Sequence, residues 1–215
     1  MQMTIRLNSV APDYIPKENW ENSEVWKKNI TIHKGEHLHI VAPSGSGKTS
    51  LVHFIYGLRN DYSGSIYYDN EDLKKLSVES FSMYRQSKMS IIFQDLRLFE
   101  KHTVMENIEI KRILNPFHPE EQISVMAQRL GIENKLHQQV KTCSYGEQQR
   151  IAIIRALMQP FDFLLLDEPY SHLDKDNRKK AMDLIYEECE KRNAAMIFAD
   201  LKPLDFFKEE KIIYL

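Results

Sequence analysis

The chain has 215 residues, the length of one globular domain, with a formal net charge of −2 and a pI near 6.5. Its 29 Lys and Arg residues balance 31 Asp and Glu residues, so no large basic field favours nucleic acid as a partner. Two cysteines, Cys143 and Cys189, form no CxxC pair and no metal spacing. This favours a reducing compartment over a disulfide-stapled secreted fold. No apolar run reaches the roughly 18–20 residues that span a bilayer, and the N-terminus lacks a signal peptide's apolar core.

Predicted strands alternate with predicted helices along the chain. The run 163–166 (Phe-Leu-Leu-Leu) is apolar without alternation, as is typical of a strand covered on both faces of a parallel sheet. We expect helices after Lys48, over much of Val104–Leu136, after Ser144 and over Arg178–Lys191. This alternation predicts an α/β domain with a mostly parallel sheet. The predicted strands are Thr4–Asn8, Leu38–Val41, Ser65–Tyr68, Ser90–Phe93, Phe163–Asp167, Ala195–Ala199 and Lys211–Leu215.

The middle of the chain has a different pattern. Between Gln94 and Cys143 the apolar spacing is helical and strand signals vanish. We therefore expect a single domain over residues 1–215, in which a helical subdomain at about residues 95–143 is inserted into the α/β core.

Residues 42–49 read Ala-Pro-Ser-Gly-Ser-Gly-Lys-Thr and lie between a predicted strand and a predicted helix. This is the context of a phosphate-binding P-loop, in which Lys48 reaches the β- and γ-phosphates and the Thr49 hydroxyl ligates Mg²⁺. The full pattern has glycine at position 42, so Ala42 is tolerated only if its φ is negative. The alternative is a tight strand–helix turn followed by a lysine. The predicted nucleotide ligands here are Pro43, Ser44, Gly45, Ser46, Gly47, Lys48, Thr49 and Ser50.

Two acids end the apolar run at 163–166. Asp167, at the carboxyl end of the predicted strand, is placed to hold the magnesium shell opposite Thr49, and Glu168 to accept a proton from the attacking water. The alternative is a solvated acidic turn before Pro169.

Residues 143–150 read Cys-Ser-Tyr-Gly-Glu-Gln-Gln-Arg. Ser144 and Glu147 form a capping box, which predicts that a helix begins here with its N–H groups free to meet an anion. As a cap alone, this motif contributes about 1 kcal/mol to helix stability.

These segments together resemble the ATP-binding cassette (ABC) family, whose signature motif is LSGGQ. The resemblance also takes in Gln94 after an apolar strand and the segment Ser171–Asp174, which is similar to the family's D-loop. It implies a P-loop NTPase fold with an N-terminal antiparallel β part, and ATP and Mg²⁺ as cofactors. It also implies a homodimer that sandwiches ATP and drives a separately encoded permease. The implied location is the cytoplasmic face of the inner membrane.

The resemblance also assigns individual roles. Gln94 is expected to join Lys48 and Glu168 in catalysis, to share the magnesium shell with Thr49 and Asp167, and to sense the membrane partner. Leu96–Ile108 is similar to the segment that lines the groove for a permease's coupling helix. Trp20 is the first candidate, and Tyr14 the second, for stacking on adenine. The residues expected to meet the partner's nucleotide are Ser144, Gly146 and Gln148.

Three positions depart from the family. Cys143 and Tyr145 replace the usual leucine and first glycine of the signature, and Tyr145 fits only if its ring points away from the phosphate. Asp200 stands where the family has a histidine that donates a hydrogen bond to the γ-phosphate. An ionised carboxylate cannot donate, so we expect slow basal hydrolysis. His172 and Lys202 are candidates to replace that histidine.

The motifs leave several functions open. The leading hypothesis is a transporter ATPase, most similar to the lipoprotein-releasing and macrolide-export type of cassette. A second hypothesis is a nucleotide-gated interaction module that closes on ATP with little turnover. A soluble cassette protein of translation or DNA repair is disfavoured, because no second cassette or sustained heptad run is present. A nucleotide kinase does not need the motif at 144–148.

Overall fold

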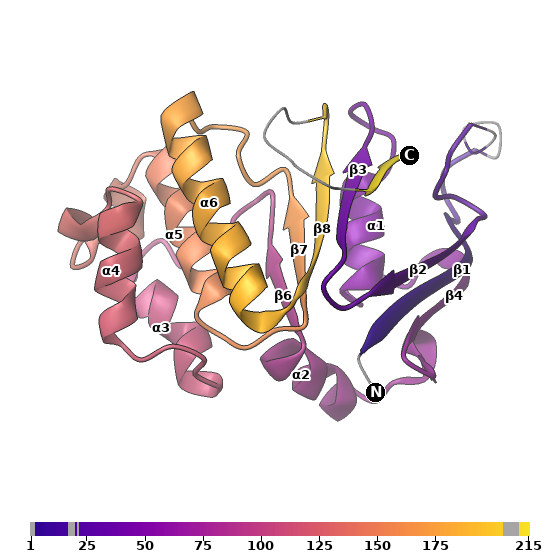
Figure 1. Ribbon diagram of the computed structural model, residues 1–215, viewed down its shortest axis with the longest axis horizontal. Helices are drawn as coiled ribbons and strands as arrows, with labels where there is room; N and C mark the ends of the chain where they lie inside the picture. Colours follow the sequence, from indigo (N-terminus) through magenta and orange to yellow (C-terminus); the bar gives the residue numbers. More distant parts are fainter. Residues whose placement is uncertain (1–2, 17–19, 21, 204–210) are drawn as a thin grey trace.

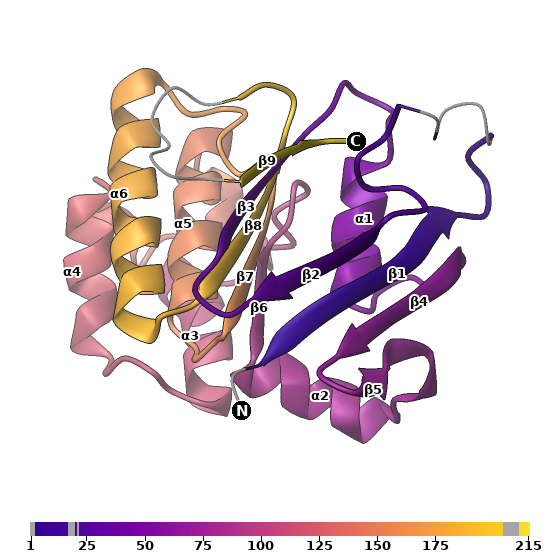
Figure 2. The ribbon, with the colours of Figure 1, turned by 45° about the vertical axis from the view of Figure 1, so that its right-hand side comes forward.

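The computed structural model describes residues 3–16, 20, 22–203 and 211–215. An antiparallel sheet lies beside a parallel sheet, and the helices α3 to α6 cover the opposite side of the parallel sheet (Figures 1 and 2). The predicted α/β class, with its antiparallel N-terminal part, is confirmed.

The antiparallel sheet has the strand order β2-β1-β4-β5. β1 continues four residues past the predicted end at Asn8, through an irregularity between Asn8 and Ala11. β2 was not predicted, because Ile32 is its one fully buried side chain and the rest of the strand is polar or partly exposed. The strands are β1 Thr4–Pro12, β2 Asn29–His33, β4 Tyr62–Tyr68 and β5 Glu71–Asp72.

The parallel sheet has the strand order β6-β7-β8-β3-β9. Leu164 and Leu166 of β7 join one hydrophobic core with the helices, whereas Phe163 and Leu165 join a second core with the antiparallel sheet. This two-sided burial explains why the run has no polar alternation. The strands are β3 His37–Val41, β6 Met89–Ile92, β7 Phe163–Asp167, β8 Ala195–Asp200 and β9 Lys211–Tyr214.

The helices follow the prediction with two corrections. α2 was missed, since none of its residues is buried and only the Ser77 cap marks its start. α6 begins before Arg178, because the Asp174 side chain accepts a hydrogen bond from the Asn177 N–H and caps an earlier start. The α-helices are α1 Lys48–Ile55, α2 Val78–Ser87, α3 Val104–Leu114, α4 Glu121–Arg129, α5 Tyr145–Leu157 and α6 Lys175–Arg192. Short 3₁₀ turns are η2 Leu73–Lys75, η3 Glu133–Lys135 and η4 Val140–Thr142.

The carboxyl ends of four parallel strands bring the predicted site residues to one edge. β3 leads into the P-loop, β6 is followed by Gln94 two residues later, β7 ends at Asp167 and β8 ends at Asp200. Ligands of open α/β sheets bind outside this edge.

Candidate nucleotide-binding site

The P-loop joins β3 to α1 and depends on two glycines. Gly45 (φ 82°) and Gly47 (φ 100°) both adopt the left-handed conformation that disfavours a side chain. A Cβ on Gly47 would also lie 3.0 Å from the side chains of Ile15 and Trp26. Such a loop, followed by a helix N-terminus, presents backbone N–H groups to an anion.

Ala42 fits the place where the family pattern has glycine. Ala42 is not among the residues with a positive φ. Its side chain is buried, and its N–H donates to the Asp200 carbonyl at 3.1 Å. The condition under which alanine is tolerated is therefore met.

Lys48 is held on the inner side of the P-loop. Its side chain is 4% exposed, and Nζ donates to the carbonyls of Ala42 (2.8 Å) and Pro43 (3.0 Å). The same nitrogen lies 3.5 Å from Glu168 Oε1. A buried cation thus faces both the loop and the acid that follows β7.

The predicted magnesium ligands lie together. Thr49 Oγ1 lies 3.2 Å from Asp167 Oδ1 and 3.4 Å from Gln94 Oε1. Asp167 Oδ2 is fully buried, and no hydrogen-bond partner for it occurs among the described residues. Burial raises the pKa of Asp167 to about 6, and the charge of Glu168 adds to that shift. A buried carboxylate oxygen without a partner, beside hydroxyl and amide oxygens, fits a hard divalent cation.

Glu168 adopts an uncommon backbone conformation. Its φ is 44°, in the left-handed region, and its N–H donates to the Ala199 carbonyl at 3.0 Å. The carboxylate accepts from Gln94 Nε2 at 3.2 Å while facing Lys48. Such strain persists where surrounding contacts over-determine it, and it is concentrated at functional sites.

Asp200 lies at the same edge as these groups. In the parallel register it is opposite Val41, the last residue before the P-loop. Burial raises the pKa of Asp200 and the charge of Glu168 raises it further, while Arg178 and Lys48 act in the opposite direction. The position expected to hold a γ-phosphate donor therefore holds a half-buried acid.

The helix predicted after Ser144 is confirmed as α5, with both hydrogen bonds of the capping box. Cys143 is buried in the helical core, as expected for a small apolar replacement. A Cβ on Gly146 would lie 3.2 Å from the His172 carbonyl, so α5 packs closely on the loop that follows β7. Gln148 Nε2 donates to the carbonyls of Val140 and Cys143, so its amide closes the turn before α5.

The predicted ring contacts with adenine remain predictions. Trp20 packs against the antiparallel core, with Lys27 Nζ 5.2 Å from its ring. The Tyr14 hydroxyl donates to Ser50 Oγ, which also accepts from Arg59 at 3.2 Å. Ser50, a predicted nucleotide ligand, thus has a side chain that is engaged within the protein.

Two cavities border the motifs. One of about 420 Å³ is lined by P-loop residues together with Ile15, Asn22 and Leu215. Another of about 320 Å³ lies beside the metal cluster. Its lining includes His53 and Asp95, which the motifs did not predict. His53 could have been found from its spacing, because it lies four residues after Thr49 and so shares its helix face. The lining residues of the second cavity are Thr49, His53, Gln94, Asp95, Tyr145 and Asp167.

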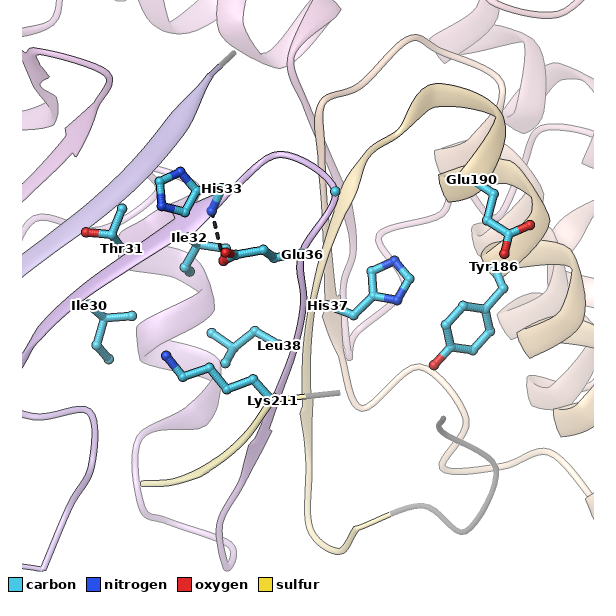
Figure 3. A pocket seen from close by; sticks show the side chains of 11 residues that line it. Ile30, Thr31, Ile32, His33, Glu36, His37, Leu38, Tyr186, Glu190 and Lys211 are labelled. Atoms are coloured by element: carbon cyan, nitrogen blue, oxygen red, sulfur yellow. Dashed lines mark hydrogen bonds between the residues drawn. The ribbon is translucent and has the colours of Figure 1, made fainter. Parts of the chain in front are cut away.

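A larger cavity lies elsewhere among the described residues. It measures about 850 Å³ and is lined by His33, Glu36, His37, Tyr186 and Glu190, among others (Figure 3). His37 begins β3, so this cavity is at the amino end of the sheet, opposite the P-loop edge. Over residues 3–16, 20, 22–203 and 211–215, no group of three or more His, Cys, Asp or Glu side chains is arranged to hold a metal. Although this cavity of about 850 Å³ is larger than those beside the motifs, it lies away from the P-loop and is not the candidate nucleotide site.

The geometry is matched by known proteins. The family model described as ABC transporter matches residues 26–171. The lipoprotein-releasing system ATP-binding protein LolD of Buchnera aphidicola is 34% identical over 190 residues, covering 87% of this chain and 82% of LolD. The aliphatic sulfonates import protein SsuB of Bacillus cereus is 32% identical, covering 91% of this chain and 74% of SsuB. The dimeric structure of the bacterial ABC transporter cassette MJ0796 superposes with a TM-score of 0.78 at 26% identity, covering 92% of this chain and 88% of that one.

The family model spans more than half of the chain, and it contains the P-loop and the acids Asp167 and Glu168. The relatives extend the match to most of the chain, and the fold agrees. The chain belongs to the ABC transporter family.

Proposed function

We propose that this chain is the ATP-binding subunit of an ABC transporter and that it binds and hydrolyses ATP with Mg²⁺. One observation carries the proposal. Thr49 lies within hydrogen-bond distance of both Asp167 and Gln94. Gln94 in turn donates to Glu168, which also faces the buried ammonium of Lys48.

Each residue has a role that follows from its chemistry. Lys48 neutralises phosphate oxygens at the P-loop, and Glu168 accepts the proton of the attacking water. Thr49, Gln94 and Asp167 offer oxygen atoms to Mg²⁺, which supplies positive charge against the β- and γ-phosphate oxygens. Burial disfavours the ionised form of Asp167 and raises its pKa, and a bound cation would supply the positive charge that favours ionisation.

We propose that two copies close around ATP. The N-terminus of α5, capped by Ser144, presents free N–H groups, that of Gly146 among them, to the γ-phosphate held by the other subunit. Two solved structures of MJ0796 support this: one is described as dimeric, and the other as a dimeric post-hydrolysis state bound to ADP and Pi.

We propose a separately encoded permease as the membrane partner, which would place the chain on the cytoplasmic face of the inner membrane. No helix in the described ranges is long and apolar enough to cross a membrane by itself. Val78 and Met83 of α2 and Leu114 of α3 are 81%, 66% and 59% exposed. Val78 and Leu114 line a cavity of about 500 Å³. Exposed apolar side chains around a cavity suit a docked helix.

We propose that residues 1–215 form one ABC ATPase domain, with an inserted helical part at about residues 95–143. α3 and α4 lie inside these limits. Both pack in the same core as α5, which begins at Tyr145 just beyond them. The names of the LolD relatives favour the lipoprotein-releasing type of cassette.

Phosphate release from ATP tests the catalytic proposal. Glu168→Gln is expected to slow hydrolysis by about 10²–10⁴-fold, the usual contribution of a general base, while ATP binding changes little. Glu100→Gln, in an exposed loop, is the matched control. Equal rates for wild type and Glu168→Gln would contradict the role of Glu168.

Asp200 favours a second candidate function, a nucleotide-gated interaction module. A half-buried acid beside Glu168 opposes charge on a γ-phosphate rather than stabilising it. If ATP pairs two wild-type chains but phosphate release stays at the Glu168→Gln level, this second function replaces the first.

A further inference from the structure

Tyr145 makes a contact that no motif requires. It is the first residue of α5, and its phenol Oη donates to the main-chain carbonyl of Gln94 at 3.0 Å, across 51 positions of sequence. Its ring meets the His172 ring edge-on, with centroids 4.3 Å apart. One side chain thus touches both the Gln94 loop and the loop that follows Glu168.

The start of α5 is located without that phenol. Gln149, which is almost fully buried, donates to Ser171 Oγ at 3.1 Å and accepts from the His172 N–H at 3.1 Å. Gly146 packs on the His172 carbonyl. Because these contacts already fix α5 to the 171–172 loop, the hydroxyl of Tyr145 adds a link to Gln94 rather than stability to α5.

The Gln94 loop has an uncommon shape that needs anchors. Leu96 and Arg97 have φ values of 57° and 47°. The Arg155 guanidinium donates to both of their carbonyls at 2.6 Å, and so holds the far side of the loop. Tyr145 holds the near side at Gln94 itself.

Moving that carbonyl moves the Gln94 side chain. The amide has its Nε2 3.2 Å from Glu168 Oε2 and its Oε1 3.4 Å from Thr49 Oγ1. Tyr145 also lines the cavity beside this cluster, together with Thr49 and Asp167.

We propose that Tyr145 is a positioning residue for hydrolysis: its phenol anchors Gln94 within the same subunit and sets the Gln94 amide between Thr49 and Glu168. The inference rests on the proposed function, because Gln94 matters only if these groups act on ATP. It adds a role for the position at which this chain departs from the glycine of the family pattern.

The test separates the hydroxyl from the ring. Tyr145→Phe keeps the ring on His172 and removes the bond to Gln94. We expect kcat for ATP hydrolysis to fall roughly 3- to 10-fold, as for the loss of one neutral hydrogen bond, with KM for ATP within about 2-fold of wild type. Tyr67→Phe, on the antiparallel sheet with Arg6 over its ring, is the matched control and should leave both unchanged.

A double-mutant cycle makes the test specific. In a Gln94→Ala background the Phe substitution should cost nothing further, because its effect passes through Gln94. If Tyr145→Phe lowers kcat by the same factor in the Gln94→Ala background as in the wild type, the proposal is overturned.

Hydrogen exchange gives a readout that does not require activity. In the nucleotide-free chain, amides of residues 94–97 should exchange roughly 3- to 10-fold faster in Tyr145→Phe than in wild type or Tyr67→Phe, while α5 is unchanged. Unchanged exchange in that loop would overturn the anchor even if hydrolysis proceeds. Faster exchange together with a wild-type protein that hydrolyses no ATP would support the anchor and count against the proposed function.

Discussion

The two halves of the candidate site differ in how closely they follow the ABC pattern. The P-loop half, with Lys48, Thr49 and Asp167, keeps each residue that the chemistry of nucleotide binding needs, and the one change, Ala42, fits without strain. The half built from the ends of β8 and α5 does not, because Asp200 replaces a donor and Tyr145 replaces a glycine. If the proposed function holds, the first half serves nucleotide binding and the second half serves turnover, and we expect that each can be altered alone.

Removing the P-loop cation should have the largest effect on binding. Lys48→Ala leaves Glu168 without its buried partner and takes away the charge that faces the phosphates. We expect ATP affinity to fall by about 10²–10³-fold, measured by equilibrium dialysis. Lys179→Ala, an exposed lysine on α6, is the control. Retained affinity in Lys48→Ala would mean that ATP binds elsewhere.

In the half of the site that contains Asp200, a substitution is expected to raise the rate of ATP hydrolysis. Asp200→His restores a side chain that can donate to the γ-phosphate, so phosphate release should rise by about 10- to 100-fold, with ATP affinity nearly unchanged. Asp200→Asn removes the charge but keeps an acceptor for the Leu201 N–H, and it should lie between wild type and Asp200→His. Wild-type turnover that is already fast, and unchanged in both variants, would refute the expectation of slow hydrolysis.

A smaller effect is expected outside both halves, at the proposed docking cavity. Burial, together with the nearby charges of Arg155 and Arg85, lowers the pKa of Lys111 to about 8. The unfolded chain therefore binds more protons than the folded chain between about pH 8 and pH 10.4, and stability rises with pH across that window. Lys111→Met should stabilise the protein by roughly 1–3 kcal/mol at pH 7 and progressively less as the pH approaches 10.4.

Thermal or urea unfolding at pH 7 and near pH 10 measures this difference. Lys101→Met, an exposed lysine before α3, should change stability little at either pH. A Lys111→Met stabilisation that is the same at both pH values would show that charge burial is not its cause.

The sequence predicted the parts of the fold that have a strong local pattern. Phe163–Asp167 and the helix after Ser144 were predicted closely, since continuous apolar burial and a capping box are local signals. α2 was not predicted because it buries no residue and so has no strong apolar periodicity. β2 was not predicted because it is recognised by its backbone pairing with β1, and its sequence has no long apolar pattern.

In the candidate site, too, some features could be predicted from the sequence and others could not. The local motifs predicted Thr49 and Asp167, and the family resemblance predicted Gln94; the structure brings these three side chains together. The bond from Tyr145 to the Gln94 carbonyl could not be predicted, since it depends on the tertiary placement of two loops 51 residues apart. The strained φ of Glu168 likewise has no signal in the residue type.

The proposed function requires that two chains share each ATP, with Lys48 of one chain and the α5 N-terminus of the other on opposite sides. Sedimentation of Glu168→Gln with ATP and Mg²⁺ tests it most directly, because slow turnover preserves the closed state. We expect a dimer that dissociates when ATP is omitted, and a monomer that still binds ATP when Ser144→Arg is added. A Glu168→Gln chain that stays monomeric with ATP bound, or a dimer unaffected by Ser144→Arg, would contradict it.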